Sequence, residues 1–133
     1  MTDHFSLAVS EMELHTMSSL ALAHIGDAVY ELMVRTELCL RGRLTARGLH
    51  RETVRHVAAP AQARAAARLL PLLIPAEREV YQRARNAKVH SVPRHAAVGD
   101  YHAATALEAL FGWLYLQGET QRLETLFAVA MED

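Results

Sequence analysis

The amino-acid sequence predicts an all-α fold, and composition is the first reason. Ala and Leu together number 42, against 12 for Val and Ile combined. Ala and straight-chain residues lose little conformational freedom in a helix, whereas strands favour β-branched and aromatic residues. The chain has 133 residues, which is the size of one domain, and neither a long linker nor an internal repeat divides it. We therefore predict a single helical domain over residues 1–133.

Helix start and stop signals supply the second reason, because they recur along the chain. After a short first helix within residues 1–17, the pattern predicts helices over residues 19–40, 46–57, 61–70, 75–85, 101–117 and 120–130. Residues suited to a first turn or an N-cap stand at the predicted starts: Ser18 and Ser19, Thr45, Pro60, Pro75 and Asp100. Gly42 follows the first long helix as a stop signal, and residues 89–99 read as a loop.

Several functional classes are excluded by what the sequence lacks. The single cysteine, Cys39, leaves no disulfide framework and no Cys-based zinc site. The chain contains no HExxH motif, no GxSxG motif and no Gly-rich phosphate loop. It also has no apolar run near the roughly 20 residues of a membrane span, and its N-terminus lacks the order of a signal peptide. We expect a soluble protein of the reducing cytoplasm.

The charge is distributed unevenly although the net charge is only −1. Residues 41–94 contain 11 Arg and one Lys against three Glu. Arg47, Arg51 and Arg55 recur every four residues with His50 beside them, and Arg83, Arg85 and Lys88 surround Asn86. Such a segment is typical of a polyanion-binding face, although a solvated set of helix surfaces would read the same. Tyr81 is its only Phe, Trp or Tyr, so duplex binding by shape fits better than stacking on single strands.

Two carboxylates stand in strongly apolar helices. Asp27 lies in the helix predicted over residues 19–40, and Glu108 is the one charged residue between 101 and 117. Because desolvating an ionised carboxylate is unfavourable, we expect each acid to have a partner that neutralises or hydrogen-bonds its charge. That partner is an arginine such as Arg35, a proton shared between the two acids, or a divalent cation such as Mg²⁺, which prefers oxygen ligands. The helix pattern alone leaves these alternatives open.

The order of motifs resembles the catalytic domain of the ribonuclease III family. The segment IGDAVYE at residues 25–31 is similar to the family's signature helix, and ALEALFGWLYLQG at residues 106–118 is similar to its second acidic helix. Between them, LHR at residues 49–51 and RARNAK at residues 83–88 resemble the compact Mini-ribonuclease III branch. The resemblance covers about residues 20–118.

This resemblance implies a homodimeric endoribonuclease that cleaves double-stranded RNA with Mg²⁺. By position, Asp27 and Glu108 match the catalytic, metal-binding acids. The residues that match regions expected to touch RNA are His50, Arg51, Arg85, Asn86 and Lys88. The compact branch is associated with maturation of the large-subunit (23S) ribosomal RNA precursor, which suggests a ribosomal protein as a further partner. Only 15 residues follow Gly118, so we expect no separate double-stranded-RNA-binding domain.

Departures from the larger enzymes of the family keep two other functions open. Their further acids correspond here to Leu20, Ala23 and Thr105, which resembles the compact branch. The reduced acid count would also suit a non-catalytic module that binds double-stranded RNA or the ribosome. A helical interaction or DNA-binding protein, in which both acids merely pair with arginines, is the third hypothesis.

Overall fold

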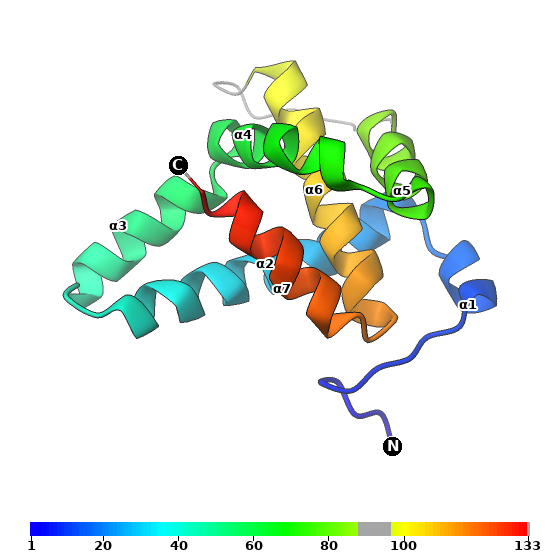
Figure 1. The fold of residues 1–133 in the computed structure, drawn as a ribbon, viewed down its shortest axis with the longest axis horizontal. Coiled ribbons are helices and arrows are strands. Elements are labelled where there is room, and N and C mark those ends of the chain that lie inside the picture. The colour runs from blue at the N-terminus through cyan, green and yellow to red at the C-terminus, as the bar shows by residue number, and fades with distance from the viewer. Residues whose placement is uncertain (88–96, 133) are drawn as a thin grey trace.

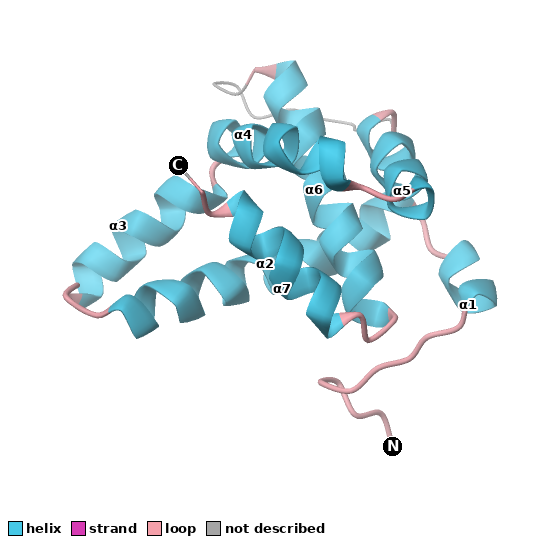
Figure 2. Ribbon diagram, viewed as in Figure 1, coloured by secondary structure: helices cyan, strands magenta, loops and turns pink. Residues whose placement is uncertain are grey.

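The computed structural model describes residues 1–87 and 97–132, and within them the regular structure is helical throughout (Figures 1 and 2). This confirms the all-α prediction for the described part of the chain. The elements are α1 (Glu11–His15), α2 (Ser19–Arg41), α3 (Ala46–Val57), α4 (Ala59–Leu69), the short 3-10 turn η1 (Leu70–Leu72), α5 (Pro75–Arg85), α6 (Val98–Leu116) and α7 (Thr120–Ala130).

The helix boundaries follow the predicted capping residues at most positions. The Ser18 hydroxyl accepts a hydrogen bond from the Ala21 N–H at 3.0 Å, and Thr45 accepts one from the Gly48 N–H at 3.1 Å. These bonds satisfy donors that the first turn of each helix would otherwise leave free. Gly42 ends α2 with a φ of 74°, a left-handed conformation that glycine adopts without strain.

The start of α6 differs from the prediction. The helix begins at Val98 after Ala97, so Asp100 lies inside its first turn and does not cap it. Val98 and Gly99 are therefore helical, and most of the predicted loop falls on residues 88–96, outside the described part of the chain. An acidic residue in a first turn still interacts favourably with the helix dipole, which is why Asp100 was a misleading cap signal.

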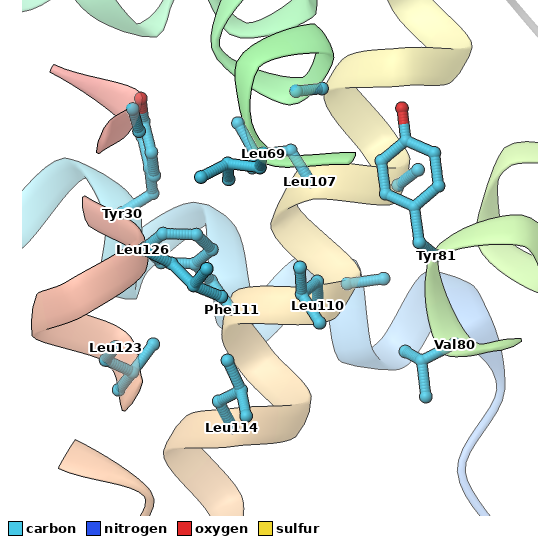
Figure 3. Packing of buried hydrophobic residues seen from close by; sticks show 14 of the residues in the cluster. Tyr30, Leu69, Val80, Tyr81, Leu107, Leu110, Phe111, Leu114, Leu123 and Leu126 are labelled. Carbon is cyan, nitrogen blue, oxygen red and sulfur yellow. The ribbon is translucent and has the colours of Figure 1, made fainter. Parts of the chain in front are cut away.

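Helix α6 forms the centre of the fold. It is buried on nearly every side, packs most extensively on α2, and is flanked by α4, α5 and α7 (Figure 1). Tyr30 of α2 places its ring edge-on against Phe111 of α6 and Phe127 of α7, with ring centroids 5.1 and 5.8 Å apart (Figure 3). The apolar composition of α6 is thus explained, because a helix surrounded by others needs no polar face.

Helix α2 is buried on one face only, although its apolar composition would suit burial on most sides. Tyr30, Val34 and Leu38 are buried, but Leu20 is 42% exposed and Leu32 is 55% exposed. A second apolar face of α2, which includes Ile25, Val29 and Leu32, lines a hollow of about 590 Å³ together with the N-terminal segment and the end of α6. The sequence shows that a face is apolar but does not show what covers it.

In the described part of the chain, no helix combines the length and apolar character required to cross a membrane.

Candidate metal and nucleic-acid site

The site forms where α2 crosses α6, and two glycines set the distance between the helices. A Cβ atom on Gly26 would overlap the backbone carbonyl of Glu108, and one on Gly112 would overlap the carbonyl of Leu22. The two helices therefore approach backbone to backbone, which only glycine permits. Asp27 follows Gly26 directly, and Glu108 lies one turn before Gly112. The close crossing brings the two predicted metal-binding acids together.

The two carboxyl groups interact directly. Asp27 is exposed, whereas Glu108 is largely buried beside it. The pKa of Glu108 is raised to about 8. Burial is the largest cause, and a hydrogen bond with Asp27 and the negative charge of Asp27 add to it, whereas a hydrogen bond with Gln62 lowers the pKa. A carboxyl in this position holds a proton near neutral pH unless a cation replaces it. The pair therefore carries a negative charge that either a proton or a cation would neutralise.

The arginine alternative is not realised among the described residues. Arg35, the nearest candidate in sequence, forms an ion pair with Glu31 at 2.6 Å on the exposed side of α2. None of the ion pairs found within residues 1–87 and 97–132 includes Asp27 or Glu108. Glu31 is therefore committed to a surface pair, and the two site acids have no basic partner there.

The positions at which larger family members carry further acids supply no ligand here. Leu20 is exposed and apolar, and Ala23 is buried. The Thr105 hydroxyl donates a hydrogen bond to the Tyr101 carbonyl at 3.0 Å, so it is engaged with its own helix. In the described residues, no group of three or more His, Cys, Asp or Glu side chains is arranged to hold a metal. The site offers two carboxylates.

Gln62 is a member of the site that the sequence analysis missed. It lies on α4, its side chain is 2% exposed, and it interacts with the carboxyl group of Glu108. Its amide nitrogen is buried without a completed hydrogen bond. The sequence did hold a signal, because Gln62 is the only polar member of the stripe Gln62, Ala65, Ala66 and Leu69 at helical spacing.

The predicted RNA-contacting residues form two separate groups. His50 and Arg51 are exposed on α3, whereas Arg85 and Asn86 lie at the C-terminal end of α5. These helices lie on opposite sides of α4 (Figure 1). Lys88 lies outside the described residues.

Not every arginine of the basic segment faces solvent. Arg68 donates hydrogen bonds to the carbonyls of Val129 and Ala130, at 3.2 and 2.5 Å, and so satisfies the C-terminal end of α7. It also lies near Tyr30, whose pKa burial raises to about 12. Arg83 pairs with Glu79 at 2.9 Å on the surface of α5. The charge of residues 41–94 is therefore partly structural, whereas Arg47, His50 and Arg51 are exposed on α3.

Comparisons with known proteins identify the family and the fold. The model of the Ribonuclease III domain matches residues 20–119. The Mini-ribonuclease 3 of Symbiobacterium thermophilum is 43% identical over 117 residues, with 88% of this chain and 90% of the relative covered. The Mini-ribonuclease 3 of Thermoanaerobacter is 40% identical, with 88% and 82% covered. The chain belongs to the ribonuclease III family.

A solved structure agrees with the family assignment. The crystal structure of a Fusobacterium nucleatum protein superimposes with a TM-score of 0.79 at 28% identity, covering 90% of this chain and 95% of that one. As a member of the family's Mini-ribonuclease 3 branch, the chain is a ribonuclease III-type endoribonuclease. The predicted resemblance and the predicted enzyme class are both confirmed.

Proposed function

We propose that this endoribonuclease cleaves double-stranded RNA with Mg²⁺ held by Asp27 and Glu108. The observation that carries the proposal is a partly buried carboxyl that faces a second one, with no ion pair to either among the described residues. Two carboxylates suit Mg²⁺, which is usually bound through one or two carboxylates while water and substrate phosphates complete its coordination. The donor set therefore fits the cation that the family implies.

The residues of the chain prepare the site for that chemistry. Bound there, Mg²⁺ would activate water and neutralise the charge that builds on the scissile phosphate. Glu108, largely buried at the crossing of α2 and α6, is fixed by packing. Asp27 is exposed one residue after Gly26, so it reaches both Glu108 and an approaching phosphate group. A rigid buried acid and an accessible one thus share one cation.

The basic residues suit a long ligand. His50 and Arg51 lie on α3, whereas Arg85 and Asn86 lie at the end of α5, so a ligand that contacts both groups must extend across α4, as a duplex can. Guanidinium and amide groups suit phosphates and 2′-hydroxyls. Tyr81 is buried, which leaves this segment without an aromatic surface for stacking single-stranded bases. With Lys88, these residues are the proposed RNA contacts.

The exposed apolar face of α2 supports the homodimer. Leu20 and Leu32 stand in solvent on the helix that also carries Asp27, and the adjoining hollow is lined almost entirely by apolar side chains. Exposed apolar patches of this kind mark interaction surfaces, and a second copy of the chain would cover them. We further propose that the protein acts in the cytoplasm on the 23S ribosomal RNA precursor, with a ribosomal protein as a further partner.

The deciding experiment is cleavage of a labelled RNA duplex with and without Mg²⁺. Asp27→Asn and Glu108→Gln should abolish cleavage but retain salt-sensitive duplex binding, because neither change touches the basic residues. Glu124→Gln, which alters an exposed acid on α7, is the matched control and should cleave normally. The matching DNA duplex should remain intact.

Three results would contradict this proposal. Cleavage retained in both site variants would show that the acids do not hold the metal. Duplex binding by the wild type without turnover on any RNA, including precursor ribosomal RNA supplied with cell extract, would favour the non-catalytic module. Equal competition by RNA and DNA duplexes would favour the DNA-binding alternative.

A further inference from the structure

The buried face of α4 contains one polar side chain, Gln62. Its neighbours on that face are Ala65, Ala66 and Leu69, each about 1% exposed, and Gln62 itself is 2% exposed. A glutamine is rarely buried in such surroundings unless its amide is hydrogen-bonded. Yet the Gln62 amide nitrogen has no completed hydrogen bond. A buried donor of this kind is unfavourable, so its position requires an explanation.

The neighbour that explains it is Glu108. Gln62 interacts with the carboxyl group of Glu108, and this interaction lowers the pKa of Glu108 and so favours the charged carboxylate. Glu108 is the carboxyl that the Gln62 amide meets on the facing helix α6, and carboxylate oxygens accept hydrogen bonds. The buried, unpaired nitrogen is therefore placed to donate a hydrogen bond to that carboxylate.

We propose that Gln62 is a positioning residue, which donates a hydrogen bond to the Glu108 carboxylate and fixes the orientation in which that carboxylate faces the cation. This inference rests on the proposed metal site and adds a third helix, α4, to those that build it. Partners that orient a metal ligand in this way commonly change metal affinity by 10- to 100-fold when they are removed.

The chemistry of an amide suits this position better than that of a charged residue. A lysine or arginine beside Glu108 would form an ion pair and compete with the cation for the carboxylate. An additional acid would increase the electrostatic repulsion that already exists between Asp27 and Glu108. The glutamine amide supplies donors without charge, so it orients the ligand and leaves its charge for the metal.

The test is a calorimetric titration of metal-free protein with Mn²⁺ as the probe, combined with thermal unfolding of the same samples. Gln62→Met keeps the length of the side chain and removes the donor. We expect Mn²⁺ to bind at least about 10-fold more weakly to this variant. Its melting temperature without metal should not fall, because the substitution also removes a buried unpaired group. Gln121→Met, a matched change at an exposed glutamine on α7, should alter neither quantity.

The outcomes separate this inference from the proposed function. Unchanged Mn²⁺ affinity with a lower melting temperature would make Gln62 merely structural and overturn the inference. Wild-type protein whose Mn²⁺ binding is absent, or is unaffected by Asp27→Asn, would instead overturn the metal site itself. If Gln62→Met is too unstable to measure, Gln62→Asn keeps an amide one methylene short of Glu108 and should show the same loss of affinity.

Discussion

Two carboxyl groups inside the fold, the buried Glu77 and the partly buried Glu108, have opposite surroundings. Glu77 is 1% exposed and accepts bonds from Arg122 at 2.8 and 2.9 Å and from the Ile74 N–H at 3.0 Å. Burial alone would raise the pKa of Glu77, but the bonds from Arg122 and Ile74 outweigh it and hold the pKa below its usual range. Glu108 faces Asp27 instead, and its pKa is raised to about 8.

The comparison contrasts a carboxylate held in a structural ion pair with a carboxylate that is proposed to bind a metal. Every bond around Glu77 stabilises its charged form, and these bonds also fix the start of α5 and tie it to α7. Around Glu108, the interaction with Asp27 raises the pKa and so disfavours the charged form. A cation bound between the two groups would reverse this effect. Strongly perturbed acids of the second kind gather at functional sites.

The largest expected effect concerns cleavage. Glu108→Gln should lower the cleavage rate by about 10³-fold or more, because losing a metal ligand removes several kcal/mol of transition-state stabilisation. Glu77→Gln, measured well below its melting temperature, should retain a near-normal rate. Single-turnover cleavage of a labelled RNA duplex compares the two. A large loss in Glu77→Gln that persists while the protein is folded would break the distinction.

Stability should show the reverse pattern. Glu77→Gln leaves Arg122 without its charged partner and should lower the free energy of unfolding by about 3 kcal/mol. Glu108→Gln removes one of two facing carboxylates and should leave that free energy unchanged or raise it. Chemical denaturation of both variants without metal, at pH 7.5, measures the difference. Equal destabilisation by the two substitutions would mean that Glu108 is an ordinary core residue.

The sequence was enough to single out Glu108 as an isolated acid, but it could not predict that Glu77 is paired and Glu108 is not. An isolated acid in an apolar helix is visible in the sequence, as are the caps at Ser18, Thr45 and Pro75, because these signals are local. The partner of Glu77 is 45 residues away on another helix, and nothing local distinguishes Arg122 from the other arginines. The exposed face of α2 and the position of Gln62 were missed for the same reason, since both depend on which helices meet.

The glycines at the helix crossing should be the next most sensitive positions. Gly26→Ala forces α2 and α6 apart and should lower the free energy of unfolding by about 2 kcal/mol, as overpacked cores do. It should also separate Asp27 from Glu108 and so reduce Mn²⁺ affinity. Gly99→Ala is the matched control in α6, because no other group lies within 4 Å of its added methyl. A Gly26→Ala protein with normal stability and Mn²⁺ affinity would contradict the role given to the crossing.

The pH dependence of stability should carry opposite contributions from the two acids. Because the folded-state pKa of Glu108 lies near 8 and the ordinary value is 4.5, its contribution to stability is fully present below pH 4.5. That contribution is lost as pH rises toward 8, since the unfolded chain releases the proton first. Glu77 has a lowered pKa, so its contribution is present above pH 4.5 and is lost on further acidification.

This smallest effect is measured as a difference between proteins. The metal-free wild type is compared with Glu108→Gln between pH 5 and 8, because every other ionisable group is common to the two proteins. Relative to the variant, the wild type should lose about 1–2 kcal/mol, less than the full pKa shift implies because the carboxyl keeps some contact with water. Saturating Mg²⁺ should restore the loss at pH 8, since binding to the folded state alone raises its stability. Parallel curves for the two proteins would show that the proton on Glu108 is not linked to folding, and the carboxyl would then resemble Glu77 after all.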